Sequence, residues 1–174
     1  LPGSLSGIEK IREGELLFLC NPNNPTGRIW PEGRLLESLE WCDRLGGTAV
    51  VDEAYMDFVA DPEACSAVSW VEDFPHLIVL RSLTKILALP GLRIGYLVSS
   101  PAVLQELQAL QPPWSLNGLA AWLGAEWMEG QGHRLFVEET REKVKLFRQE
   151  FEAGLYGFSE IRPLPTASNF FLCW

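Results

Sequence analysis

The sequence predicts an α/β domain with a mostly parallel sheet. Short apolar runs alternate with longer amphipathic stretches, which is the pattern of strands and helices that follow one another along a chain. The predicted strands are residues 16–20, 48–52, 77–81 and 94–99. Continuous apolar runs such as residues 48–51 are typical of central strands that are covered on both faces.

A helix is predicted between the first two strands, over residues 31–45. Pro31 suits the first turn of a helix, and Gly46 follows the predicted end. Apolar side chains recur at helical spacing within the segment, at Leu35, Leu36, Leu39 and Cys42. We therefore expect this helix to pack one apolar side against the sheet.

Three further helices are predicted in the second half of the chain. They cover residues 101–110, 116–128 and 133–155, and the last is long and heavily charged on one side. Beyond Gly157 the character of the sequence changes, and two short strands are predicted at 158–162 and 168–174, separated by a proline-rich turn.

The change in character predicts two domains. Residues 1–130 form the larger domain, and residues 131–174 form a connecting helix and the start of a smaller α+β domain. The chain begins with Leu1 instead of methionine and has no basic segment followed by an apolar run. We therefore expect a fragment of a longer protein and not a processed secreted protein.

Composition excludes several functional classes. The 174 residues are 47% hydrophobic and 21% charged, which is ordinary for a globular domain with one substantial core. A net charge of −9 argues against a nucleic-acid partner, because the phosphate backbone would be repelled. The longest apolar runs are far shorter than the roughly 20 residues that a membrane helix needs, so no membrane span is predicted.

Cysteine and histidine spacing predicts neither a metal site nor a redox motif. The four cysteines are Cys20, Cys42, Cys65 and Cys173, and no two of them form a CxxC motif. We expect reduced thiols and a cytoplasmic protein, since a chain with a core of this size does not need disulfides. His76 and His133 have no partner at ligand spacing, so neither is assigned a role.

Polar segments follow three of the predicted strands, where the ligand crevice of an open α/β sheet lies. The first is the turn Asn-Pro-Asn-Asn-Pro-Thr-Gly at residues 21–27. A cis bond between Asn24 and Pro25 would direct the Asn24 amide inward, where it could donate uncharged hydrogen bonds. An ordinary solvent-exposed turn explains the same residues.

The second segment places an acid directly after a buried strand. Asp52 follows the apolar run 48–51, and a carboxylate in that place is unfavourable unless a cation or hydrogen-bond donors compensate it. Tyr55, three residues further on, can present its phenol to the same spot. A helix cap or a solvated turn explains Asp52 equally well, and packing explains Tyr55.

The third segment predicts a nucleophilic amine beside an anion site. Lys85 follows a strand and two hydroxyl side chains, Ser82 and Thr84. Desolvation at such a position lowers the pKa of an ammonium group, so a neutral amine becomes accessible. Arg93 offers a planar set of donors suited to phosphate. A solvated surface lysine is the alternative.

Together these residues match the functional groups of pyridoxal phosphate. The cofactor needs an amine for a Schiff base, a phosphate clamp, an acid opposite its ring nitrogen and neutral donors to its phenolic oxygen. An acid that keeps the pyridine protonated makes the cofactor an electron sink, which gives Asp52 a chemical reason for its burial.

The order and spacing of these motifs resemble the fold type I, class I/II aminotransferase superfamily. The motifs are the NPxNPTG-type turn, then DEAY, then SxTK, then an arginine eight residues beyond the lysine. The resemblance covers essentially the whole chain. It implies a three-layer α/β/α large domain and pyridoxal 5'-phosphate as the cofactor.

The resemblance also implies a role for each matched residue. Lys85 corresponds to the Schiff-base lysine and Asp52 to the partner of the pyridine nitrogen. Tyr55 and Asn24 correspond to donors to the phenolic oxygen. The phosphate clamp corresponds to Ser82, Thr84 and Arg93.

Within the superfamily, the chain most resembles threonine-phosphate decarboxylases of cobalamin biosynthesis. The resembling segments are residues 82–85, 90–93 and 113–117. Histidinol-phosphate aminotransferases are the closest relatives of these enzymes and the alternative assignment. Both handle phosphorylated amino-acid-type substrates.

The family pattern includes parts that this chain lacks. Members are about twice as long, with an N-terminal part that supplies another phosphate-binding loop and a ring-stacking aromatic residue. The arginine that holds the substrate carboxylate would follow shortly after Trp174. A catalytically incompetent fragment is therefore a second hypothesis, and a cofactor-free lysine aldolase is a third that leaves Asp52 and Arg93 without a shared purpose. The resemblance also implies a homodimer, with residues 114–123 as the apolar stretch expected at its interface.

Overall fold

The computed structural model describes residues 14–130 and 132–174. Parts of the predicted domains that fall on residues 1–13 and 131 lie outside the described residues. The strands are β1 (Leu16–Cys20), β2 (Thr48–Asp52), β3 (Leu77–Ser82) and β4 (Gly95–Ser99). The α-helices are α1 (Glu32–Arg44), α2 (Leu83–Ile86), α3 (Pro101–Leu110), α4 (Gly118–Glu129) and α5 (Gly132–Leu155). The described residues also contain the short 3₁₀ helices η2 (Met56–Phe58), η3 (Ala67–Trp70) and η4 (Pro90–Leu92).

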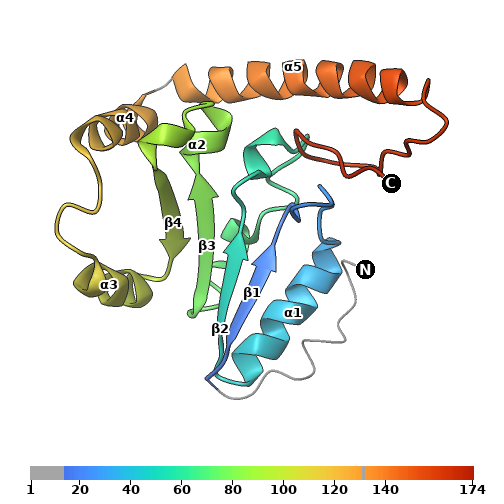
Figure 1. Cartoon of the computed structure of the whole chain (residues 1–174). Helices are drawn as coiled ribbons and strands as arrows, with labels where there is room; N and C mark the ends of the chain where they lie inside the picture. The colour runs from blue at the N-terminus through green and yellow to red at the C-terminus, as the bar shows by residue number, and fades with distance from the viewer. Residues whose placement is uncertain (1–13, 131) are drawn as a thin grey trace.

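The sheet has the order β1-β2-β3-β4 (Figure 1). β1, β2 and β3 are parallel, and β4 is antiparallel to β3, which confirms the predicted α/β class with a mostly parallel sheet. The register pairs Cys20 with Asp52, and Asp52 with Leu80. The carboxyl ends of the three parallel strands therefore meet at one edge of the sheet, on the side where α5 lies (Figure 1).

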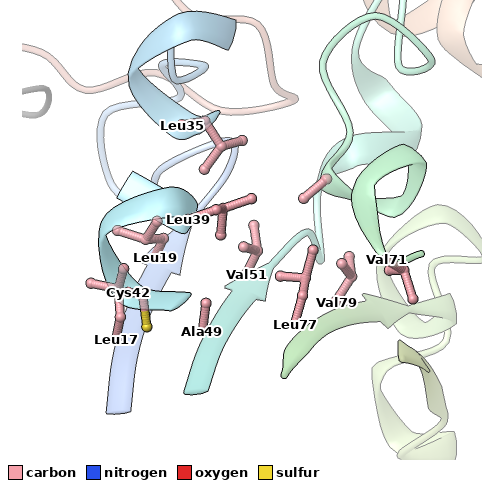
Figure 2. Packing of buried hydrophobic residues seen from close by; sticks show 11 residues of the cluster. Leu17, Leu19, Leu35, Leu39, Cys42, Ala49, Val51, Val71, Leu77 and Val79 are labelled. Atoms are coloured by element: carbon pink, nitrogen blue, oxygen red, sulfur yellow. The ribbon is translucent and has the colours of Figure 1, made fainter. Parts of the chain in front are cut away.

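The main core lies between α1 and one face of the sheet (Figure 2). Leu35, Leu39 and Cys42 project from one side of α1, as their helical spacing predicted, and each is buried. They pack with residues from all three parallel strands, including Leu17 and Val51. Burial of each leucine stabilises the fold by about 1.5–3 kcal/mol. This core fixes the strands whose ends form the candidate site.

A second apolar cluster lies next to the carboxyl edge of the sheet. Leu83 and Ile86 of α2 pack there against Ala120 of α4. Val137 and Val144 of α5 pack against the same cluster. The cluster therefore holds the short helix α2 between the sheet and the two later helices.

β1 is covered on one face, and the prediction of two covered faces is wrong for this strand. Leu17 and Leu19 are buried, whereas Leu16 and Phe18 are 60% and 57% exposed. α1 packs on the side of Leu17 and Leu19. An apolar run cannot reveal this difference, because it does not report which face of the strand has a neighbour.

Small differences in boundaries have local causes. β4 begins at Gly95 and not at residue 94, and α4 begins at Gly118 and not at residue 116. Asn117 sets the start of α4, since its side chain accepts a hydrogen bond from Ala120 N–H at 2.9 Å. Such a capping residue lies outside the helix that it begins.

The two strands predicted after α5 do not form. Arg162 and Trp174 exchange two backbone hydrogen bonds of 3.0 Å, and the neighbouring pair Pro163 and Cys173 forms an isolated antiparallel bridge. The two segments pair as predicted, but over a shorter length. Pro163 and Pro165 have no N–H groups, so a longer ladder would lack donors.

The helices in the described part of the chain do not have the combination of length and apolar character that crossing a membrane requires.

Candidate active site

Three polar side chains share one face of the sheet at its carboxyl edge. Successive residues of a strand point to opposite faces, and register partners in parallel strands share a face. Cys20 and Asp52 are register partners, and Ser82 lies two residues beyond Leu80, the partner of Asp52. We call the side of Cys20, Asp52 and Ser82 the Asp52 face. It is the face on which chemistry is expected.

Lys85 is hydrogen-bonded to the hydroxyl groups that precede it. It lies in α2, which begins immediately after β3. Its Nζ donates a hydrogen bond to Thr84 Oγ1 at 3.3 Å. The Thr84 oxygen lies 2.8 Å from Ser82 Oγ, and either hydroxyl can be the donor. The structure thus brings three predicted site residues into one hydrogen-bonded chain, with Thr84 buried and Lys85 half-buried.

Tyr55 lies beside the Lys85 amine. The distance from Lys85 Nζ to the centroid of the Tyr55 ring is 5.9 Å, within the range of a cation–π contact. The same ring packs edge-on against Phe170, with centroids 4.9 Å apart. Tyr55 therefore joins the Lys85 region to the C-terminal segment.

Asp52 is half-buried at the end of β2. Its Oδ1 accepts a hydrogen bond from Ala54 N–H at 3.0 Å, which fixes the direction of the carboxylate. The pKa of the neighbouring Cys20 thiol is raised, mainly by burial and further by the negative charge of Asp52, while the Asn24 backbone N–H acts in the opposite direction.

Asn24 lies in the turn after β1, and its side chain is exposed. The Asn24–Pro25 peptide bond is cis, as proposed from the sequence. The turn is closed around Asn23, whose Oδ1 accepts a bond from Thr26 Oγ1 at 2.8 Å and whose carbonyl accepts one from Gly27 N–H at 2.6 Å.

Gly27 is where this turn meets the C-terminal segment. Its φ of +65° favours glycine, and a Cβ at this position would lie 1.8 Å from Thr166 Oγ1. The Gly27 carbonyl accepts a hydrogen bond from Ala167 N–H at 2.8 Å. The glycine of the motif is therefore required by the close approach of two chain segments.

Arg93 is exposed and directly follows η4, two residues before β4 begins. Its Nη1 donates a hydrogen bond to Pro90 O at 3.1 Å, and its backbone has a left-handed φ of 52°. This conformation is uncommon for a residue with a side chain. The contact with Pro90 holds the guanidinium against its own loop, next to the end of α2.

Sequence reasoning assigned no role to two charged residues that are neighbours of the predicted site. Glu53 follows Asp52, and Arg81 precedes Ser82, but both point to the opposite face. They form an ion pair of 2.8 Å there. Alternation of side chains along the two strands is the sequence signal that could have found them, once the register of β2 and β3 was known.

Comparison with known families identifies the chain. Residues 4–173 match the family model described as aminotransferase class I and II. The chain belongs to the aminotransferase class I and II family. The family assignment agrees with the resemblance seen in the motifs, which lie in the matched range.

Three relatives of this aminotransferase-family chain are informative. A threonine-phosphate decarboxylase of Salmonella typhimurium is 42% identical over 135 residues, which are 73% of this chain and 36% of the relative. The crystal structure of a histidinol-phosphate aminotransferase from Clostridium acetobutylicum has a TM-score of 0.84 and 27% identity, over 97% of this chain and 49% of that one.

The third relative was solved with a cofactor. The histidinol-phosphate aminotransferase of Sinorhizobium meliloti, in complex with pyridoxal-5'-phosphate, has a TM-score of 0.76 and 28% identity. The match covers 91% of this chain and 41% of that one. The chain thus spans less than half of the length of each of these relatives.

Proposed function

We propose that the chain contains the cofactor-binding part of a pyridoxal-phosphate-dependent enzyme that acts on an amino acid. The observation that supports this proposal is the hydrogen-bonded chain of Ser82, Thr84 and Lys85, located at the same sheet edge as the carboxylate of Asp52. Membership of the aminotransferase class I and II family supports it further. The cofactor is assigned as pyridoxal 5'-phosphate.

The donor set fits the chemistry of this cofactor. Lys85 supplies an amine for a covalent bond to the aldehyde carbon. Two hydroxyl groups 2.8 Å apart, Ser82 Oγ and Thr84 Oγ1, together with the Arg93 guanidinium, are donors suited to a phosphate. Asp52 is an acceptor for a protonated ring nitrogen. Donors to the phenolic oxygen are Tyr55 and Asn24, the latter after its exposed side chain turns inward.

Each residue performs a separate task in the proposed mechanism. When bound, pyridoxal phosphate withdraws electrons from a bond at the substrate Cα. Asp52 keeps the proton on the ring nitrogen, because its negative charge favours the protonated pyridine. With the cofactor bound, Lys85 Nζ would transfer protons near the substrate Cα. Thr84 Oγ1 orients that nitrogen through the hydrogen bond between them.

We propose threonine phosphate as the substrate and decarboxylation as the reaction. The 42% identity to the Salmonella typhimurium threonine-phosphate decarboxylase supports this choice. The TM-score of 0.84 to a histidinol-phosphate aminotransferase supports transamination of histidinol phosphate as the alternative. Which bond at Cα breaks would depend on how the residues of the site orient the substrate.

An assay of the natural full-length protein, supplied with pyridoxal phosphate, distinguishes the two reactions by their products. With threonine phosphate we expect release of carbon dioxide and no keto acid. Formation of a keto acid without carbon dioxide would replace decarboxylation by transamination. A protein that gains no visible absorbance with the cofactor would be the catalytically incompetent form, and absorbance that persists in Lys85→Ala would contradict the assignment of Lys85.

We further propose the domain division, the location and the assembly of the protein. Residues 1–130 belong to the large domain, and residues 131–174 begin the smaller one. The protein is cytoplasmic and forms a homodimer through residues 114–123. Exposed apolar side chains support this interface, since Trp114 is 97% and Trp122 61% exposed. Sedimentation of the natural protein tests the dimer.

A further inference from the structure

A buried polar layer lies on the face of the sheet opposite the Asp52 face. Each of the three parallel strands contributes one residue to this layer at its carboxyl end. The contributed residue is a sequence neighbour of a residue of the Asp52 face. The three residues are Asn21, Glu53 and Arg81. Glu53 is 1% exposed and Asn21 is fully buried. We call these three residues and Ser66, which bonds to two of them, the buried polar layer.

Arg81 is the cation of this layer. Its Nη2 lies 2.8 Å from Glu53 Oε2 and donates to Ser66 Oγ at 2.9 Å. Its Nη1 lies 3.4 Å from Asp57 Oδ1. The Arg81 side chain is 12% exposed, and its Nε has no hydrogen-bond partner among the described residues. A charge buried in this way is unfavourable unless its pairing is retained.

The carboxylate of Glu53 is held by several donors. Ser66 Oγ donates to its Oε2 at 2.8 Å, and Ala67 N–H donates to its Oε1 at 2.6 Å. The Glu53 backbone N–H also continues the sheet, since it donates to Leu80 O at 2.8 Å. The peptide that joins Asp52 to Glu53 is therefore fixed from both sides.

One guanidinium thus joins two segments that contain the proposed site. Arg81 is bonded to Ser82 and lies close in sequence to Lys85. Its two partners, Glu53 and Asp57, lie in the segment that directly follows Asp52, one on each side of Tyr55. Arg81 therefore adds two ion pairs to the backbone pairing that already joins β2 and β3.

Asp57 extends the connection to a third element. Arg141 of α5 donates from its Nε to the Asp57 carbonyl at 3.2 Å. Burial raises the pKa of the Asp57 carboxyl, and the charges of Arg81 and Arg141 lower it. The segment after β2 is therefore fixed between β3 on one side and α5 on the other.

We propose that Arg81 is a positioning residue that sets the Lys85 amine and the Asp52 carboxylate at the separation needed for cofactor attachment. The inference rests on the proposed function. Arg81 touches neither cofactor nor substrate in this proposal. It acts through Glu53 and Asp57.

The test removes the charged pair while keeping partners for the neighbouring polar groups. In the double variant E53Q and R81M, the amide oxygen of the glutamine can accept from Ala67 N–H, and its NH2 can donate to Ser66 Oγ. The matched control is R34M with E37Q, which removes an exposed Arg–Glu pair of 3.0 Å on α1. R81K, which keeps the charge but not the planar donors, is the conservative variant. All are made in the natural full-length protein.

Two measurements report on Lys85 without turnover: the Kd for pyridoxal phosphate and the pH midpoint of the visible absorbance of the attached cofactor. Circular dichroism shows which variants are folded. We expect the folded double variant to bind about tenfold more weakly or worse, which is about 1.4 kcal/mol, with a shifted midpoint. The control stays unchanged, and R81K lies between them.

A folded double variant with a Kd within about twofold of the control and an unmoved midpoint would overturn the inference. If the double variant does not fold, the same two measurements on R81K test the inference. A higher Kd for pyridoxal phosphate with a moved pH midpoint supports it. A Kd and a midpoint equal to those of the control overturn it. If the natural protein itself does not attach pyridoxal phosphate at Lys85, the proposed function is wrong. That result differs from one in which the natural protein attaches the cofactor and only the Arg81 inference is wrong.

Discussion

The two faces of the sheet differ at its carboxyl edge, although residues of the two faces alternate along the same strand ends. Asp52 is half-buried and points to the Asp52 face. Its neighbour Glu53 is 1% exposed and is paired with Arg81 on the other face. Adjacent carboxylates of similar chemistry therefore have different environments.

This difference separates the residues of each motif that are proposed to bind the cofactor from those that stabilise the fold. Groups in the buried polar layer are paired, because an unpaired buried charge is strongly destabilising. Groups on the Asp52 face, such as the Ser82 and Thr84 hydroxyls, bond mainly to one another and to Lys85. The comparison predicts that substitutions on the buried side mainly lower stability, and that substitutions on the Asp52 face mainly lower activity.

The largest expected effect is the loss of the buried cation. Arg81→Met leaves Glu53 and Asp57 without their guanidinium partner, so the free energy of unfolding should fall by about 3–5 kcal/mol. Urea unfolding followed by circular dichroism measures it. Arg34→Met, which breaks an exposed pair, should lower the same quantity by less than about 1 kcal/mol. Equal losses in the two variants would contradict the comparison.

The second effect concerns the neighbouring acid of the Asp52 face. Asp52→Asn keeps an oxygen for Ala54 N–H but removes the charge, so the turnover of the amino-acid substrate should fall by about 10²–10³-fold. The free energy of unfolding should change by less than about 1 kcal/mol. Steady-state rates and urea unfolding of one preparation give both values. A variant that keeps its turnover, or unfolds as easily as Arg81→Met, would argue against this assignment.

A third effect compares another pair of neighbours, Cys20 and Asn21. Asn21 Nδ2 donates to Cys65 O at 2.9 Å, and its Oδ1 accepts from Trp30 N–H at 3.0 Å. Asn21→Ala leaves both partly buried groups without this partner and should lower the free energy of unfolding by about 1–3 kcal/mol in total. Cys20→Ser, on the Asp52 face, should lower it by less than about 1 kcal/mol. Thermal unfolding ranks the two, and the reverse order would break the comparison.

The smallest expected effect is a pH dependence. Burial raises the pKa of Glu53 above its ordinary value, and the Arg81 charge and the hydrogen bonds lower it without cancelling that rise. The folded state therefore holds the Glu53 proton more tightly than the unfolded state. This contribution to stability is present below the ordinary pKa of a glutamate and is lost as pH rises through the raised pKa.

Glu53→Gln should remove this dependence. The difference in the free energy of unfolding, natural protein minus variant, should fall as pH rises through that interval and stay level above it. Urea unfolding at closely spaced pH values measures the difference, in which contributions of the other carboxylates cancel. A difference that rises with pH would show that the folded state lowers the pKa of Glu53.

Local patterns in the sequence predicted most of the fold. The strands 16–20 and 48–52 were predicted with their observed bounds, since continuous apolar runs end there at polar residues. The helix 101–110 was predicted equally well, because Pro101 marks its first turn. The exposure of one face of β1 was not predictable, because it depends on which elements pack against the strand. The shortened pairing near residue 163 was not predicted either, because it depends on which backbone N–H groups are present.

In the candidate site, too, features set by nearby residues in the sequence were predictable, and features set by pairing between strands were not. Ser82, Thr84 and Lys85 were predicted together because they are close in sequence, and the structure links them by hydrogen bonds. The pairing of Glu53 with Arg81 was not predictable, because it depends on the register between two strands. Four motifs in one order identified the family, yet the same motifs contain residues of both faces.

The central claim is that Lys85 attaches pyridoxal phosphate. The most direct measurement treats the natural full-length protein with the cofactor, reduces it with borohydride and maps the modified peptide by mass spectrometry. We expect a reduced pyridoxyl group on Lys85, absent from a Lys85→Ala sample treated in parallel. An unmodified Lys85, or a label that persists in Lys85→Ala, would contradict it.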